Sequence, residues 1–170
     1  MTLSEFKKSD KSKTPFYTLL GYPIDHSWSP LMHNIALKYY NMDARYVAIS
    51  VPNHELNDLA SFLNDDHFLG ANITIPYKEM LMDYLDMIDP SARKIGAINT
   101  IVKNDFQLKG ANTDYIGFQA PLQEYEYELD GSSVVVFGSG GASRAIVIAL
   151  QDMGVARIYL VSRSPSTKSS

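Results

Sequence analysis

Short strand-like runs alternate with longer helix-like segments along the first half of the chain, and this alternation constrains the fold most. Strand-like runs occupy Phe16–Leu20, Tyr46–Val51 and Ala71–Ile75, with helix-like segments at Pro30–Tyr40 and Asn53–Leu63 between them. Such alternation is typical of right-handed βαβ units, in which a helix crosses between two parallel strands. The sequence therefore predicts an α/β fold whose first domain contains βαβ units and a mostly parallel sheet.

The middle of the chain predicts a helix and a hairpin. Over Pro76–Ile88, apolar residues recur at three- and four-residue spacing, which predicts an amphipathic helix that ends at Asp89-Pro90. Beyond it, the β-like runs Ala97–Val102 and Phe106–Lys109 flank a short polar turn. Two such runs around a turn favour a β-hairpin.

The last third of the chain begins the alternation again. A helix is predicted over Asp114–Glu124, and an acidic connector follows up to Ser132. The pattern then predicts a strand at Val134–Phe137, a helix that includes Ile146–Leu150, and a strand at Ala156–Val161. This order is typical of the start of a Rossmann dinucleotide-binding domain.

The expected domains follow from these segments. Residues 1–15 are polar, rich in Lys and Ser, and lack the apolar stretch of a secretion signal, so we expect a flexible tail. Residues 16–115 are expected to form a substrate-binding and catalytic domain, and residues 116–170 the first part of an incomplete Rossmann domain.

The composition disfavours several classes of function. Fifteen Lys plus Arg against 19 Asp plus Glu give a formal charge of -4 without a basic block, so nucleic acid is not an expected partner. The chain has no cysteine, which excludes disulfides and thiolate chemistry and suits a reducing cytoplasm. Its four histidines form no HExxH-type pair, so no metal is expected, and its apolar runs are too short to cross a membrane.

A glycine-rich loop follows the strand Val134–Phe137. Gly138 and Gly140 let the backbone turn tightly and approach a pyrophosphate, whose charge meets the free N–H groups of the next helix. The third glycine of the GxGxxG pattern is replaced by Ser143, which leaves a purely structural turn as the alternative. The setting between a strand and a helix favours a dinucleotide.

The residues after the next strand bear on the choice of dinucleotide. No acidic residue occurs after Asp152, whereas an NAD enzyme places an acid there to bind the ribose. This chain has Ser162, Arg163 and Ser164 at the strand end, with Lys168 beyond. Because a guanidinium makes bidentate hydrogen bonds to phosphate, the segment favours NADP, with a solvated basic strand end as the alternative.

Polar residues also follow several strands of the first half. The loops are HSWSP from His26, NITIPYK from Asn72, GAINT from Gly96 and GANTD from Gly110. The carboxyl ends of parallel strands open into one crevice, so these loops can converge on a small polar ligand. Each also has a structural interpretation, because Ser29, Thr74 and Asp114 are suited to capping helices.

Together these motifs resemble the shikimate dehydrogenase family. The runs GYPIDHSWSPLMHN, GANITIPYK, GAINTIV, GANTDYIGF and FGSGGASRA occur in the order and approximate spacing of that family. The resemblance extends from Phe16 to Lys168 and implies NADP-dependent, reversible reduction of 3-dehydroshikimate to shikimate, in the cytoplasm, by a monomer or homodimer. Full-length members are roughly a hundred residues longer, so a truncated, inactive chain is one expectation.

The resemblance also implies roles for individual residues. Lys78 and Asp114 match the catalytic pair of the family, and the matched substrate-binding residues are Ser27, Ser29, Thr74, Lys78, Asn99 and Asp114. The matched cofactor-binding residues are Gly138, Gly140, Gly141, Ala142, Ser162, Arg163, Ser164 and Lys168. Ser162-Arg163-Ser164 departs from the commoner Asn-Arg-Thr of the family. Two alternatives stay open: a quinate/shikimate dehydrogenase that uses NAD, and a non-catalytic module that senses shikimate or quinate.

Overall fold

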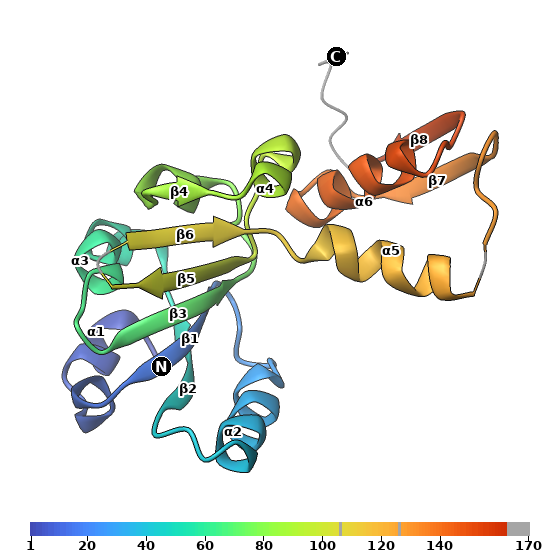
Figure 1. Ribbon diagram of the computed structural model, residues 1–170. Helices are drawn as coiled ribbons and strands as arrows, with labels where there is room; N and C mark the ends of the chain where they lie inside the picture. The colour runs from blue at the N-terminus through green and yellow to red at the C-terminus, as the bar shows by residue number, and fades with distance from the viewer. Residues whose placement is uncertain (106, 126, 163–170) are drawn as a thin grey trace. The chain divides into compact units, whose positions relative to one another are not determined.

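The chain divides into two compact units in a computed structural model that describes residues 1–105, 107–125 and 127–162 (Figure 1). The first unit contains Met1–Asp89 and Ile98–Ala111, and the second contains Pro90–Ala97 and the chain from Asn112 onward. Each unit is therefore built from two separate stretches of the chain.

The first unit is organised around a mixed sheet. Its described strands are β1 (Phe16–Gly21), β2 (Arg45–Ser50), β3 (Phe68–Ile73), β4 (Met87–Ile88), β5 (Thr100–Asn104) and β6 (Gln107–Ala111). They lie in the order β2-β1-β3-β5-β6-β4. β1 pairs in parallel with β2 and β3, whereas β5 runs antiparallel to β3 and β6. The predicted α/β class is confirmed, and so is the hairpin.

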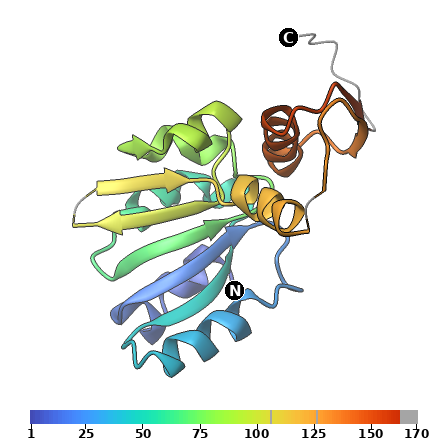
Figure 2. The same cartoon turned by 45° about the vertical axis from the view of Figure 1, so that its right-hand side comes forward.

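Helices pack on both faces of this sheet (Figure 2). Successive side chains of β1 point to opposite sides, so apolar residues of this strand can contact helices on either face. Phe16 contacts the ring of Phe62 on α3 (Leu59–Leu63) at a centroid distance of 5.6 Å. Leu19 points to the other face and packs with Leu37 of α2 (Ser29–Tyr39). The predicted helix over 53–63 is a 3₁₀ helix, η2 (Asn53–Asp58), followed by α3.

The first fifteen residues are ordered, in contrast to the expected flexible tail. They form α1 (Leu3–Lys7) and a 3₁₀ helix, η1 (Asp10–Lys13). Thr2 and Glu5 make a capping box at the start of α1, and Ser50 at the end of β2 donates its N–H to the Met1 carbonyl at 2.9 Å. The polar composition concealed two apolar residues three apart, Leu3 and Phe6, which share one helix face and are buried.

A buried carboxylate from η2 holds the start of α1. Glu55 is 6% exposed, and its two oxygens accept hydrogen bonds from the N–H groups of Leu3 at 2.9 Å and Ser4 at 3.3 Å. Burial by itself raises the pKa of Glu55, but the hydrogen bonds from Ser4 and Leu3, with the charge of His54, bring it below its usual value. The ionised form is therefore the one that stabilises the fold.

We expect Glu55→Gln to lower the free energy of unfolding at neutral pH by about 1.5–3 kcal/mol, the usual worth of hydrogen bonds to a charged group. The pKa of Glu55 is lower in the folded than in the unfolded chain, so this stabilisation is complete above the unfolded pKa of about 4.3 and is lost as the pH falls through the folded value. Urea unfolding at several pH values measures the difference. Glu124→Gln, at an exposed position, is the control, and a difference that stays constant into acid would contradict the prediction.

The predicted amphipathic helix over Pro76–Ile88 is wrong. Only Met80–Tyr84 is helical, as the 3₁₀ helix η3, and the chain then enters β4. β4 pairs in parallel with β6, where Asp86 donates its N–H to Leu108 at 3.0 Å and Asp89 to Gly110 at 2.9 Å. Pairing with a distant strand replaces the local hydrogen bonds that a longer helix would need, and the apolar spacing in the sequence gives no sign of this.

The second unit contains a two-stranded parallel sheet and three helices within the described residues. These are α4 (Pro90–Ile95), α5 (Asp114–Glu124), β7 (Ser133–Phe137), α6 (Gly141–Asp152) and β8 (Arg157–Val161). Ile95 and Ala97 pack with Ala145 of α6. Lys94 pairs with Asp152 at 2.8 Å, and the Tyr115 hydroxyl donates to the same carboxylate at 2.7 Å. α4, which the sequence did not predict, thus belongs with α5 and α6.

Candidate active site

The two serines of the HSWSP loop lie side by side at the start of α2. The Ser27 hydroxyl donates to the Ser29 hydroxyl at 3.1 Å, and the Ser29 N–H donates to the Ser27 hydroxyl at 3.2 Å. Ser29 does not cap the helix, since it is the first helical residue and the N-cap is Trp28; the Ser27 hydroxyl accepts the N–H of that first residue. The structural interpretation of Ser29 is therefore wrong, and both hydroxyls are half-buried beside each other.

Asn34 fixes α2 against β2. Its amide nitrogen donates to the Tyr46 carbonyl at 2.8 Å, while its amide oxygen accepts the Tyr46 N–H at 2.9 Å. This pair of hydrogen bonds extends the edge of the sheet onto the helix. It holds the middle of α2 against the start of β2.

Tyr46 and His33 line a pocket of the first unit, whose lining includes neither serine. The two rings stack with centroids 4.2 Å apart, and the Tyr46 hydroxyl donates to the Asn72 amide oxygen at 2.8 Å. Burial lowers the pKa of His33 below its ordinary value, so the ring is neutral at pH 7. A pocket of about 470 Å³ is lined by these three side chains and by Thr100, among others.

The ends of β3 and β5 bring Thr74, Lys78 and Asn99 into one region of the first unit. Thr74 donates its N–H to the Leu20 carbonyl at 2.9 Å, and the Asn99 carbonyl accepts the Ile73 N–H at 2.7 Å. The Lys78 carbonyl accepts the N–H of Ile98 at 2.7 Å. These backbone hydrogen bonds tie the three loops together, although Asn99 precedes β5, which runs antiparallel to β3, and does not follow a parallel strand as the sequence argument assumed.

Close packing holds the Lys78 loop in place. The hydroxyl of the buried Tyr77 donates a hydrogen bond to the Val51 carbonyl. The adjacent Lys78 is half-buried. At the end of β1, a Cβ on Gly21 would lie 2.3 Å from a Thr74 methyl group, so only glycine lets this threonine approach the strand. Thr74 caps no helix, because the next helical segment is η3 at Met80.

Asp114 belongs to the second unit, at the first turn of α5. Its side chain does not cap the helix, whose N-cap is Thr113, and its N–H donates to the Asn112 amide oxygen at 2.9 Å. The Asn112 amide in turn donates to the Ala97 carbonyl at 2.9 Å. Lys78 and Asp114 lie in different units, so their pairing stays a prediction.

The glycine loop between β7 and α6 is the predicted site of a dinucleotide phosphate. Gly138 has a φ of 110°, a conformation that favours glycine, and a Cβ on Gly140 would meet nothing within 4 Å. The first turn of α6 carries no acidic residue and no side-chain cap, which leaves its N–H groups to an anion. Ser143, in place of the third glycine, is buried against Gly138.

The predicted residues for the 2′-phosphate lie mostly beyond the described part of the chain. Ser162 directly follows β8, whereas Arg163, Ser164 and Lys168 fall outside the described residues. Within residues 1–105, 107–125 and 127–162, no cluster of His, Asp or Glu has the makings of a metal site. None of the helices in the same ranges has the length and apolar character needed to span a membrane.

Comparison with known proteins shows what the chain is similar to. Residues 19–101 match the model of the shikimate dehydrogenase substrate binding domain. A Bacillus cereus protein named shikimate dehydrogenase (NADP(+)) is 48% identical over 149 residues, which cover 87% of this chain and 54% of the relative. Over most of its length the chain is therefore similar to shikimate dehydrogenases. A Moorella thermoacetica member is 43% identical over 91% of this chain and 52% of its own length.

Solved structures of the family share the fold. Shikimate dehydrogenase 1 from Peptoclostridium difficile superposes with a TM-score of 0.84 at 33% identity, covering 92% of this chain and 58% of that one. A Thermus thermophilus family member in complex with NADP(H) and shikimate gives 0.76 at 35% identity, covering 89% and 57%. The chain spans about half the length of the curated relatives it matches.

Proposed function

We propose that the protein to which this chain belongs reduces 3-dehydroshikimate reversibly to shikimate with NADP, as a cytoplasmic oxidoreductase of aromatic amino-acid biosynthesis. The observation that carries the proposal is the grouping of Ser27, Ser29, Thr74, Lys78 and Asn99 in one unit of the fold. The relatives named above support it through their names and through the complex with shikimate and NADP(H).

The chemistry assigns a task to each group. Ser27 and Ser29 offer adjacent hydroxyls, which suit the two oxygens of a carboxylate, while Thr74 and Asn99 suit ring hydroxyls. Lys78 is proposed to deliver a proton to the C3 oxygen during reduction and to take it back during oxidation, with Asp114 orienting it. NADPH, when bound, supplies the hydride. We propose that Gly138, Gly140, Gly141 and Ala142 hold its pyrophosphate, and that Ser162, Arg163, Ser164 and Lys168 bind the 2′-phosphate.

We expect a version of the chain extended to the length of its relatives to oxidise shikimate far better with NADP than with NAD. Such a version can be made by adding the part of the Bacillus cereus relative that this chain does not match. Because Arg163 is proposed to bind the 2′-phosphate, Arg163→Ala should raise the KM for NADP and leave that for NAD almost unchanged. Initial rates followed by NADPH absorbance measure both constants.

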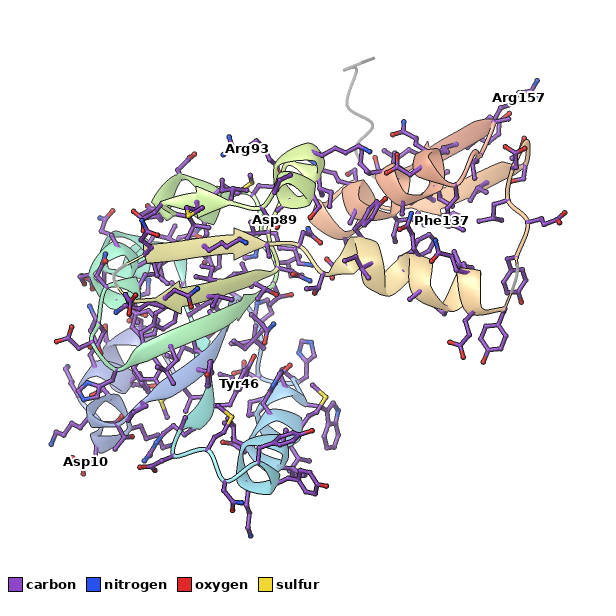
Figure 3. All side chains as sticks on the ribbon, in the orientation of Figure 1. Asp10, Tyr46, Asp89, Arg93, Phe137 and Arg157 are labelled. Atoms are coloured by element: carbon purple, nitrogen blue, oxygen red, sulfur yellow. The ribbon has the colours of Figure 1, made fainter. Side chains whose placement is uncertain are left out.

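Arg157→Ala is the matched control, since Arg157 is an exposed arginine at the start of β8 (Figure 3). It should leave both KM values near those of the parent. Equal efficiency with NADP and NAD would favour the quinate/shikimate dehydrogenase that uses NAD. Shikimate binding without any turnover would favour the sensing module.

A further inference from the structure

A buried asparagine joins the start of α5 to the segment that follows α4. Asn112 is 3% exposed, and both halves of its side-chain amide are hydrogen-bonded. The nitrogen donates to the Ala97 carbonyl at 2.9 Å, and the oxygen accepts the Asp114 N–H at 2.9 Å. All three residues belong to the second unit, where α4 lies beside α6 (Figure 1). The amide of Asn112 thus fixes the backbone of Asp114 to that of Ala97.

Helix capping alone does not require an asparagine at this position. The first N–H groups of a helix have no partner within it, and the Asn112 oxygen accepts one of them. Serine, threonine or aspartate would serve as well for that purpose. An ionised aspartate has no donor, however, and a serine hydroxyl is shorter, so neither keeps the hydrogen bond to Ala97. The second hydrogen bond therefore points to a role beyond the cap.

The peptide group between Ala97 and Ile98 has a further partner. Its carbonyl accepts the Asn112 amide, and its N–H, on Ile98, donates to the Lys78 carbonyl at 2.7 Å. The boundary between the two units falls at this peptide group, and each of the two hydrogen bonds lies within one unit. Because a peptide group is planar and rigid, the Lys78 backbone and the Asn112 side chain are bound to one inflexible element.

Packing holds the residue on the other side of Asp114. Tyr115 packs against the cluster that Ala97 forms with Ala145 of α6. Its hydroxyl also donates to Asp152 of the same helix at 2.7 Å. The start of α5 is thereby attached to Ala97 twice, by the asparagine before Asp114 and by the tyrosine after it.

We propose that Asn112 is a positioning residue for the proposed catalytic pair, because it ties the start of α5 to the peptide group that also binds the Lys78 backbone. This role rests on the proposed function, which gives Lys78 and Asp114 their tasks. Asn112 acts through Asp114 and not on the substrate. Proton transfer by Lys78 depends on the placement of the pair, and small displacements of catalytic groups cost large factors in rate.

The test uses Asn112→Ser in the version extended to the length of the relatives. Serine keeps an oxygen for the cap of α5 and is too short to hold Ala97. We expect kcat for shikimate oxidation to fall about fivefold to a hundredfold, with the KM for NADP unchanged because the glycine loop is untouched. Asn64→Ser is the matched control, since the exposed Asn64 also donates its amide to a backbone carbonyl, that of Ala60 at 2.9 Å. It should leave kcat within about twofold of the parent.

A double-mutant cycle separates positioning from a general loss of structure. A residue that acts through the catalytic pair has little left to do once the Lys78 side chain is gone. In the Lys78→Ala background, Asn112→Ser should therefore lower kcat by less than about twofold. An equal loss in both backgrounds would overturn the proposal, and so would an unchanged kcat for Asn112→Ser in an extended parent that oxidises shikimate.

A second variant and a second readout complete the test. If Asn112→Ser does not fold, Asn112→Asp takes its place, because it keeps the size and the acceptor and lacks the donor once ionised. In the 170-residue chain, either variant should shift the backbone amide NMR signal of Ile98, whose peptide group loses a partner. An unshifted Ile98 signal would contradict the tie. An extended parent without shikimate oxidation would defeat the proposed function and with it the catalytic role, whereas the Ile98 signal separately reports whether Asn112 binds this peptide group.

Discussion

Replacing Lys78 by alanine is expected to lower kcat for shikimate oxidation by about 10²- to 10⁴-fold, the usual contribution of general acid–base catalysis. The assay uses the version extended to the length of the relatives. A group that transfers a proton acts chiefly in the transition state, so the KM for shikimate should change much less than kcat. The half-buried position of Lys78, anchored by Tyr77 beside it, suits a group that must be held near the reacting oxygen.

Lys38→Ala provides the control for this measurement. Lys38 is an exposed lysine near the end of α2, and its loss removes the same charge without touching the proposed site. It should leave kcat within about twofold of the parent, since surface substitutions have small effects. A fall of only a few-fold for Lys78→Ala would assign Lys78 to binding, and another group would have to carry the proton.

Replacing Phe6 by alanine is expected to lower the free energy of unfolding by about 3–5 kcal/mol, the range for removing a buried phenylalanine. Phe6 is 1% exposed, and its ring lies 4.7 Å from that of Phe16 and 5.9 Å from that of Phe62. Removing it opens a cavity under the sheet that these rings cannot refill. Urea unfolding of the 170-residue chain measures the loss.

Phe137→Ala is the matched substitution on the outside. Phe137 is 79% exposed at the end of β7 (Figure 3), so its loss should change the free energy of unfolding by about 0.5 kcal/mol or less. If Phe6→Ala had an equally small effect, residues 1–15 would behave as the dispensable tail that their composition suggested.

The sequence predicted secondary structure best where the residues that determine an element lie within one short stretch. The hairpin of β5 and β6 is set by two β-like runs around a turn in which Asp105 adopts a positive φ of 51°. The prediction of a flexible N-terminal tail was wrong because burial of two side chains, Leu3 and Phe6, orders a segment of polar composition. The prediction of a helix over Pro76–Ile88 was wrong because part of this segment, β4, pairs with β6, about twenty residues further along the chain.

The candidate site was predicted only in part, because the sequence shows motifs within short stretches but not contacts between distant strands. Ser27, Ser29, Thr74 and Asn99 stand in motifs that the family resemblance identified, and the structure groups them in one unit. Tyr46 and Asn72 were not predicted as site residues, because their contact joins two strands and no spacing in the sequence reports it. His33 gives only a weak signal, as a histidine one turn into the helix after the serines.

The interleaving of the two units sets a rule for exchanging parts between family members. α4 lies between β4 and β5 in the chain, yet its residues Lys94 and Ile95 bind and pack against α6 of the second unit. A chimera joined at a single point after residue 111 would therefore combine a foreign α6 with the native α4. A transplant of the nucleotide-binding half should carry residues 90–97 along with it, so that Lys94 meets the Asp152 with which it is paired here.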